Sequence, residues 1–289
     1  MLCQLSYGGG GRSVVPASYA DPMPAPRTTP VALTVAGSDP SGGAGLQADL
    51  KVFHRHGVYG ASVVTLLTVQ NTRSVRAVKL EDPGFVVAQL DAVLDDVPPA
   101  AAKTGALGGT AIIEAFAERA ADFDFPLVVD PVMVSKHGAA LMAADAVDAL
   151  VRRLLPHAAL VTPNLPEAAR LAGFEVRTAS DMERAARAIG SLGARAVLVK
   201  GGHLEGDAMD LLWADGCAVH MPGERIASTH THGTGCTLSA AITARLARGE
   251  ALEHAVRGAR AFVRAAIANA PGLGGGCGPV DHFAPVDGD

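Results

Sequence analysis

Cysteine is scarce in this sequence of 289 residues, and its spacing argues against two common uses. The four cysteines are Cys3, Cys217, Cys236 and Cys277, too far apart along the chain for a CxxC pair or another short metal-binding motif. Four cysteines in a chain of this size also do not indicate a fold stapled by disulfides. We therefore expect reduced thiols in a cytoplasmic protein.

Long apolar runs and clusters of basic residues are missing as well. No stretch approaches the roughly 18 consecutive apolar residues of a membrane span. The formal net charge is −5 and the lysines and arginines are scattered, so the sequence offers no basic footprint for nucleic acid or anionic lipid. We expect neither nucleic acid nor membrane as a partner.

The N-terminal segment lacks both the basic region and the apolar region of a signal peptide. Four consecutive glycines (Gly8 to Gly11) and four prolines between Pro16 and Pro26 favour a disordered tail over residues 1–30. No linker-like segment interrupts the pattern after that point, and hydrophobic residues make up 49% of the chain. We therefore predict one domain over residues 31–289.

Within that domain, apolar strands alternate with amphipathic helices, which predicts a mostly parallel sheet covered on both faces, a three-layer α/β/α fold. Predicted strands span residues 31–36, 61–70, 75–80, 100–104, 127–130, 159–162, 196–200, 211–213 and 217–221. Predicted helices span residues 46–56, 83–96, 110–121, 144–155, 166–172, 181–192, 235–248 and 252–269.

Ligands of open α/β sheets bind outside the carboxyl ends of the strands. Polar residues follow several of the predicted strands at that edge: Ser38, Asp39, Lys103, Thr104, Asp130, Thr162, Asn164 and Lys200. These positions are the first candidates for a functional site.

The most informative motif is Gly233-Thr234-Gly235-Cys236 at the start of a predicted helix. The glycines allow close backbone approach, and the N-terminus of a helix directs N–H groups at an anion such as a phosphoryl group in transfer. Taken alone, the motif fits an ordinary glycine-rich helix start equally well. Cys236 would lie at that helix start, an environment that lowers the pKa of a thiol, so it is a candidate base for an attacking hydroxyl; a positioning or packing role is the alternative.

Three further residues would complete a site for phosphates. Lys200 stands at the end of an apolar strand before two glycines, where a long cation can reach phosphate oxygens, although such a lysine is often simply solvated. Asn164 and Glu167 offer oxygen ligands that suit Mg²⁺, or else they form a helix cap.

The chain resembles the hydroxymethylpyrimidine/phosphomethylpyrimidine kinase family of thiamine biosynthesis, within the ribokinase-like superfamily. The resemblance runs in order through AGSDPSGGAGLQADLK, TVQNT, AAKTGALG, VVDPVMVSKHG, TPNLPEA, VLVKGGHLEG, THGTGCTLSAAI and GPVDHF. It implies phosphorylation of 4-amino-5-hydroxymethyl-2-methylpyrimidine and then of its monophosphate, with ATP as the phosphoryl donor and Mg²⁺ as the cofactor. It also implies a central sheet of about eight to ten strands and a homodimer.

The resemblance also assigns residues to roles. Gln70, Gly37 and Asp49 would bind the pyrimidine, with the Gln70 amide offering a donor and an acceptor side by side. Asp130 and Glu167 would serve the metal. Lys200, Asn164, Thr231 and His232 would contact the nucleotide, while Gly233, Thr234, Gly235 and Cys236 would form the anion hole and the base, with Lys200 beside them.

Two departures from the family pattern concern the substrate pocket. Ala106 stands where many relatives have methionine, and the loop Ser135 to Ala140 is a variant of the family's flap. Two other functions stay open at this point. One is a vitamin B6 kinase, since some of these share GTGC; the other is an inert ligand-binding regulator, which the intact Lys200, Glu167 and GTGC disfavour.

Overall fold

The computed structural model describes residues 29–135, 138, 141–143, 145–202 and 208–286. Its centre is a nine-stranded sheet in the order β3-β2-β1-β4-β5-β6-β7-β8-β9. The strands are β1 (Val31–Ser38), β2 (Tyr59–Gln70), β3 (Val75–Leu80), β4 (Ala101–Thr104), β5 (Leu127–Val129), β6 (Leu160–Val161), β7 (Ala196–Val199), β8 (Ala208–Ala214) and β9 (Cys217–Gly223).

The six central strands, from β2 across to β7, run parallel to one another. The outer strands β3, β8 and β9 pair antiparallel. The predicted mostly parallel sheet and its implied strand number are therefore confirmed. Because the central strands are parallel, their carboxyl ends share one edge, which brings loops from distant parts of the chain together.

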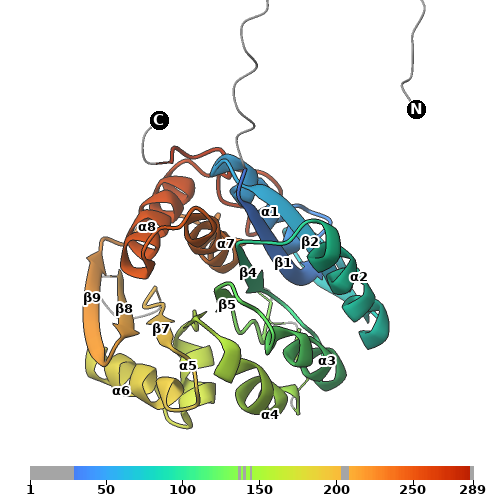
Figure 1. Cartoon of the computed structure of the whole chain (residues 1–289). Helices are drawn as coiled ribbons and strands as arrows, with labels where there is room; N and C mark the ends of the chain where they lie inside the picture. The colour runs from blue at the N-terminus through green and yellow to red at the C-terminus, as the bar shows by residue number, and fades with distance from the viewer. Residues whose placement is uncertain (1–28, 136–137, 139–140, 144, 203–207, 287–289) are drawn as a thin grey trace, which may run out of the picture.

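Helices cover both faces of this sheet, as Figure 1 shows. They are α1 (Gly45–Arg55), α2 (Pro83–Asp96), α3 (Thr110–Ala120), α4 (Ala146–Ala149), α5 (Leu165–Ala172), α6 (Ala179–Gly190), α7 (Thr234–Ala247) and α8 (Leu252–Ala268). One buried apolar cluster joins α2 to α6 with the sheet, and a second joins α1, α7 and α8 with the other face. The predicted three layers follow from this double coverage, because each face of the sheet buries its own core.

The predicted helix over residues 144–155 is wrong in detail. Within the described residues, α4 is a short α-helix followed by a π-helical stretch, η1 (Leu150–Leu154), and a 3-10 turn, η2 (Leu155–His157). Pro156 cannot donate a backbone hydrogen bond, so it ends the helix there. The wider π turn keeps both Leu150 and Leu154 buried against the core.

β3 and α2 have the predicted boundaries, and the boundaries of the other elements differ from the predictions by a few residues at most. One difference affects the site: β7 ends at Val199, and Lys200 follows it in an isolated bridge with Asn164. The Lys200 N–H donates to the Pro163 carbonyl at 2.8 Å. Lys200 is thus held against the loop that begins α5.

Two predictions fall wholly or partly outside the described residues. The tail over residues 1–30 lies almost entirely there, as do residues 136–137 and 139–140 of the Ser135 to Ala140 loop. The tail and the single domain over residues 31–289 stay predictions. Within the described part of the chain, no helix has the length and apolar character needed to cross a bilayer.

Candidate active site

A cavity of about 1770 Å³ opens at the carboxyl edge of the sheet. All the residues to which the resemblance assigned a role line it, with the exception of Asp49, whereas the strand-end candidates Lys103, Thr104 and Thr162 do not. The lining residues from that prediction are Gly37, Gln70, Asp130, Asn164, Glu167, Lys200, Thr231, His232, Gly233, Thr234, Gly235 and Cys236. The fold therefore collects into one space residues that lie up to two hundred positions apart in sequence.

The glycine-rich motif forms the N-terminus of α7. Gly233 caps the helix with φ of 79°, a left-handed conformation that glycine adopts without strain. A Cβ at this position would collide with the Gly43 carbonyl oxygen, so the motif also packs against the β1–α1 loop. The Thr234 N–H donates to the Thr231 carbonyl at 3.4 Å, whereas the N–H groups of Gly235 and Cys236 have no carbonyl partner within the helix. Both residues line the cavity, and a helix start of this kind suits an anion.

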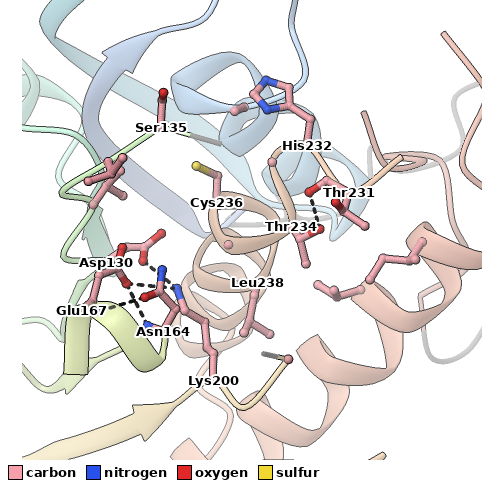
Figure 2. Close-up of a pocket in the computed structure, with 18 of the residues that line it drawn as sticks. Asp130, Ser135, Asn164, Glu167, Lys200, Thr231, His232, Thr234, Cys236 and Leu238 are labelled. Carbon is pink, nitrogen blue, oxygen red and sulfur yellow. Dashed lines mark hydrogen bonds and ion pairs between the residues drawn. The ribbon is translucent and has the colours of Figure 1, made fainter. Parts of the chain in front are cut away.

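Cys236 is half-buried at this helix start, where Figure 2 shows its sulfur directed into the pocket. Burial raises the pKa of the Cys236 thiol to about 11, although Lys103 and the N–H of Gly45 act in the opposite direction. The expected lowering of its pKa is therefore not found in the ligand-free protein, because loss of solvation outweighs these favourable contacts. A base at this position would be a neutral thiol at rest.

Lys200 joins two carboxylates on the opposite wall of the cavity (Figure 2). Its Nζ lies 3.0 Å from Oδ1 of Asp130 and 4.0 Å from Oε2 of Glu167. Its side chain is 15% exposed, and those of Asp130 and Glu167 are 2% and 8% exposed. Burial, together with the charge of Asp130, raises the pKa of Glu167 to about 7 despite the opposing effect of Lys200. Two carboxylates therefore share one cation, and a further positive charge bound here would reduce the repulsion between them.

Asn164 and Glu167 form a helix cap, the structural alternative raised by the sequence. The Asn164 side chain accepts from the Glu167 N–H at 2.9 Å, and the Glu167 carboxylate accepts from the Asn164 N–H at 2.8 Å. This capping box starts α5 and fixes both side chains at the cavity wall. The side-chain oxygen of Asn164 already accepts this hydrogen bond, so a contact of Asn164 with a nucleotide would use its side-chain amide nitrogen.

Asp49 lies beneath the cavity and does not line it. Its carboxylate accepts from Thr34 Oγ1 at 2.6 Å and from Lys103 Nζ at 2.9 Å, and neither Asp49 nor Lys103 is exposed. The predicted contact of Asp49 with substrate has no support in this arrangement and stays a prediction. Lys103 was a candidate site residue from its place at a strand end, but its pairing with Asp49 was not predicted from the sequence.

The far end of the cavity is shaped by an ion pair that the sequence analysis did not find. Arg260 Nε donates to Oδ2 of Asp210 at 2.7 Å, and the Gly201 N–H donates to Oδ1 of the same carboxylate at 2.8 Å. This chain of contacts ties the loop after Lys200 to α8. Arg260 and Arg264 both line this end of the cavity, and each is paired with a carboxylate, Asp210 and Glu224 respectively.

His232 does not face the same wall as Lys200. Its Nε2 lies 2.8 Å from Oδ2 of Asp39 and 3.2 Å from the amide of Gln70, and Figure 2 shows its ring directed away from Lys200. The predicted contact of His232 with the nucleotide is untested, but its imidazole is engaged on the side of Gln70.

The arrangement combines an anion site at a helix N-terminus, a lysine and a pair of buried carboxylates. Preorganised N–H groups and a cation stabilise the charge that spreads over a transferring phosphoryl group. The half-buried thiol and the amide of Gln70 stand on the other side of that anion site. The geometry therefore fits transfer of a phosphoryl group to a small polar acceptor.

Comparison with known proteins gives the same result. A family model described as phosphomethylpyrimidine kinase matches residues 39–281. The chain is 49% identical over 258 residues to a hydroxymethylpyrimidine/phosphomethylpyrimidine kinase of Streptomyces coelicolor, covering 89% of this chain and 96% of the relative. It is 51% identical over 259 residues to one of Rhizobium meliloti, covering 88% of this chain and 97% of the relative.

Solved structures of two related kinases share the fold. An ADP complex of Bacillus subtilis pyridoxal kinase is 38% identical with a TM-score of 0.82, covering 89% of this chain and 98% of that one. A phosphomethylpyrimidine kinase of Clostridium difficile is 40% identical with a TM-score of 0.73, covering 82% and 98%. Because the family model spans most of the chain and the relatives match over nearly their whole length, this chain belongs to the phosphomethylpyrimidine kinase family.

Proposed function

We propose that this protein transfers the γ-phosphoryl group of ATP to 4-amino-5-hydroxymethyl-2-methylpyrimidine and then to the resulting monophosphate, a step of thiamine biosynthesis. The observation that carries the proposal is the placement of Gly233 to Cys236 between two distinct walls of one cavity. Lys200 and the carboxylates stand on one side, while Gln70 contacts His232 on the other (Figure 2). The two sides suit a nucleotide and a polar heterocycle respectively.

In the first reaction, the hydroxymethyl oxygen attacks the γ-phosphorus while the bond from phosphorus to the bridging oxygen breaks and ADP leaves. The hydroxyl proton passes to the Cys236 sulfur, which must have given up its own proton to solvent beforehand. The N–H groups at the start of α7 and the Lys200 ammonium stabilise the charge on the phosphoryl oxygens. Cys236 acts as the base because it lies directly beside that anion site.

In the second reaction the attacking atom is a phosphate oxygen. The second pKa of a phosphate monoester is about 6, so at neutral pH most of the nucleophile has no proton to lose. The same anion site and Lys200 serve this step, and it needs little proton removal by Cys236. One cavity can therefore carry out both transfers with different demands on Cys236.

Asp130 and Glu167 fit a Mg²⁺ ion. Mg²⁺ is usually held by one or two carboxylates together with waters and substrate phosphates, and this pair is buried with an excess of negative charge. Among the residues that the structure describes, no group of three or more acidic, histidine or cysteine side chains forms a fuller metal cage. Asp130 and Glu167 would hold the ion, and the ion would supply positive charge that offsets the negative charge of the ATP phosphates.

Pyridoxal or pyridoxine is a second candidate substrate. The solved structures that resemble this chain include pyridoxal kinases with a TM-score of 0.82. Ala106, which lines the cavity, leaves room for a larger ring substituent than methionine would. Both vitamers carry a hydroxymethyl group on a nitrogen heterocycle, so the same phosphoryl site could serve them.

An ADP-release assay with ATP and Mg²⁺ tests these alternatives by comparing hydroxymethylpyrimidine, its monophosphate, pyridoxine and pyridoxal side by side. The expected result is turnover of both pyrimidines, and Lys200→Met purified in parallel is the control for a contaminating kinase. Turnover of B6 vitamers alone would overturn the pyrimidine assignment. Tight pyrimidine binding without any ATP consumption would instead identify an inert binding protein.

We also propose a homodimer. Apolar side chains on the β2–β3 hairpin are well exposed, including Leu67, Val69, Val78 and Leu80, and β3 is the edge strand of the sheet. Exposed apolar edge strands promote association unless another surface covers them. Light scattering on the purified chain should give twice the monomer mass, and Leu67→Lys with Leu80→Lys should reduce it to the monomer value.

We propose a cytoplasmic location because the described cysteines are not joined in disulfides. Cys217, Cys236 and Cys277 are all free in the described part of the chain. Free thiols persist in the reducing environment of the cytosol. Cell fractionation with antibodies to this chain would check the location.

A further inference from the structure

Three side chains from three separate segments meet at the substrate side of the cavity. Asp39 comes from the β1–α1 loop, Gln70 ends β2, and His232 directly precedes Gly233. The Nε2 atom of His232 lies 2.8 Å from Oδ2 of Asp39 and 3.2 Å from the Gln70 amide nitrogen. Asp39 and His232 are each 3% exposed, whereas Gln70 is half-buried, and all three border the cavity.

The Asp39 carboxylate is a hydrogen-bond acceptor in this cluster. It accepts from the N–H and hydroxyl of Ser41 at 2.9 and 2.8 Å and from the Ala44 N–H at 3.0 Å. Burial by itself would raise the pKa of Asp39, but the hydrogen bonds from His232 and Ser41 more than offset this and lower it. An ionised carboxylate can only accept, so the Nε2 atom of His232 must carry the proton between them.

That proton determines which way the Gln70 amide can face. A protonated Nε2 can only donate, so an amide nitrogen 3.2 Å away has nothing to bond to. The oxygen and nitrogen of an amide are nearly the same size, and the hydrogen bonds decide which occupies each position. The favourable arrangement therefore places the Gln70 carbonyl oxygen next to His232 and turns its NH₂ group to the cavity.

The backbone around His232 holds the ring in place. The His232 N–H donates to the Gly278 carbonyl at 3.0 Å, and the Val280 N–H donates to the His232 carbonyl at 3.4 Å. A Cβ added to Gly43 would lie 2.6 Å from Cδ2 of the imidazole, so the ring fills the space above that glycine. A ring packed this closely cannot turn over to offer its other nitrogen without moving the loop.

We propose that the Asp39–His232 pair sets the hydrogen-bond polarity of Gln70, so that the cavity presents an NH₂ donor and selects a ring that offers an acceptor nitrogen at that point. Asp39 and His232 are positioning residues in this scheme, and Gln70 makes the contact. The inference rests on the proposed pyrimidine substrate. In 4-amino-5-hydroxymethyl-2-methylpyrimidine a ring nitrogen is such an acceptor, whereas in the 4-oxo analogue the ring nitrogen beside the carbonyl carries a proton.

The first experiment reads the tautomer in the ligand-free protein, independently of any reaction. Long-range ¹H–¹⁵N correlation spectra, assigned by comparison with His232→Gln, should show the proton on Nε2 and an unprotonated Nδ1. A neutral ring with its proton on Nδ1 would overturn the proposal. This result does not depend on which heterocycle the enzyme phosphorylates, so failure of the proposed function leaves it readable.

The second experiment measures kcat/KM for the 4-amino and 4-oxo compounds. Asp39→Asn can donate to His232, which would shift the proton to Nδ1 and let Gln70 turn its carbonyl to the cavity. The amino-to-oxo ratio should then fall by about fivefold or more, since the smallest usual cost of an unpaired buried polar group corresponds to about that factor. The KM for ATP should stay within about twofold, because the nucleotide wall is unchanged.

Two further variants distinguish an effect on the hydrogen-bond polarity of Gln70 from an effect on the β1–α1 loop. Gln70→Glu keeps an oxygen towards His232 but replaces the NH₂ donor, so the KM for the 4-amino compound should rise while that for ATP does not. Lys51→Met removes the contact of Lys51 Nζ with the Gly42 carbonyl at 2.7 Å and so perturbs the same loop without altering the proton on His232. It should leave the amino-to-oxo ratio unchanged.

A merely structural role gives a different pattern. If Asp39 and His232 only hold the anion loop, Asp39→Asn would lower kcat for both compounds equally and raise the KM for ATP, with no change in their ratio. That outcome would overturn the proposal. If Asp39→Asn does not fold, Gln70→Glu together with the tautomer measurement decides the question.

Discussion

Lys103 and Asp49 form a salt bridge of 2.9 Å in which neither side chain has any exposed surface, directly beneath the cavity that Cys236 lines. Lys103 lowers the pKa of the Cys236 thiol, and Asp49 raises it, although burial is the largest influence. Burial also disfavours the charged form of Lys103, yet Asp49 and Cys236 hold the pKa of this lysine above its ordinary value. The buried pair therefore sets the electrostatic environment of the thiol.

Neutralising the two partners should shift the Cys236 thiol in opposite directions. Lys103→Met removes a cation and should slow alkylation of Cys236 by iodoacetamide at pH 8, while Asp49→Asn should accelerate it, each by about threefold or more. The measurement uses a background in which Cys3, Cys217 and Cys277 are serine. Shifts of the same sign in both variants would show that the pair acts only through the fold.

Loss of one partner leaves a buried charge unpaired and costs on the order of 3–5 kcal/mol of stability. The double variant Lys103→Met with Asp49→Asn avoids that cost because neither charge remains. It should be more stable than Lys103→Met alone, with an alkylation rate between those of the single variants. Thermal unfolding checks the first expectation.

Replacing Cys236 by alanine should separate the two phosphorylation steps. General-base catalysis contributes about 10²- to 10⁴-fold, and only the hydroxymethyl substrate has a proton that must be removed in most molecules at pH 8. We expect kcat for hydroxymethylpyrimidine to fall by at least about 10²-fold, while kcat for the monophosphate falls far less and both KM values change little. Rapid-quench measurement of each step tests this, and equal losses in the two steps would assign Cys236 to positioning.

The pH dependence of the first step should reflect the raised pKa of the thiol. Because that pKa is about 11, the thiolate fraction grows steadily between pH 7 and pH 9, and log kcat for hydroxymethylpyrimidine should rise with it. The monophosphate reaction should be nearly flat over the same range. A pH-independent first step in wild type would argue against a thiolate base.

The ion pair of Asp210 and Arg260 should govern affinity for ATP. Asp210→Asn weakens the link between the Gly201 N–H and α8, so the KM for ATP should rise by about tenfold while the KM for the pyrimidine stays within about twofold. Asp91→Asn is the matched control, because it breaks the exposed pair with Arg119 far from the cavity. Equal increases in both KM values would indicate a general defect of the fold.

A buried histidine should make the protein sensitive to acid. Burial lowers the pKa of His56 to about 4, and the cations of Arg245 and Arg248 add to the effect. Between pH 6.5 and 4 the unfolded chain takes up a proton that the native state excludes, so the free energy of unfolding falls as the pH falls. The full loss from this group is on the order of 3 kcal/mol.

Replacement of His56 by glutamine tests that linkage. The side chain of His56 donates from Nδ1 to the Val52 carbonyl at 2.9 Å, a bond that a glutamine amide can replace. Urea unfolding across pH 4–7 should show a shallower decline for His56→Gln than for wild type. His54→Gln, at an exposed position in the last turn of α1, which His56 caps, should keep the wild-type decline.

Much of the fold could be predicted because the apolar runs of this sequence are periodic. Local patterns predict the alternation of strands and helices; an example is the apolar segment Ala196 to Val199, which is buried throughout. The π-helical turn at Leu150–Leu154 was not predictable in this way, because its hydrogen bonds span five residues instead of the four of an α-helix and leave no separate mark in the apolar pattern. Packing of Leu150 and Leu154 against the core, rather than local preference, selects it.

The site could be assembled from sequence to the extent that its residues follow strand ends. The carboxyl edge of a parallel sheet is shared, so Asp130, Asn164 and Lys200 had to come close together. The direction in which each side chain faces was not determined by that rule. Asp49 pairs with Lys103, and His232 pairs with Asp39. Such pairs form because a buried charge or polar group without a partner inside the protein is unfavourable.

The sequence by itself determined the layered architecture and the glycine-rich start of α7, because each depends on patterns a few residues long. Only the tertiary structure decided the raised pKa of the Cys236 thiol, the partner of Asp49 and the contact of Gln70 with His232. Those properties depend on solvation and on charges brought near from distant segments, and neither quantity exists until the chain has folded.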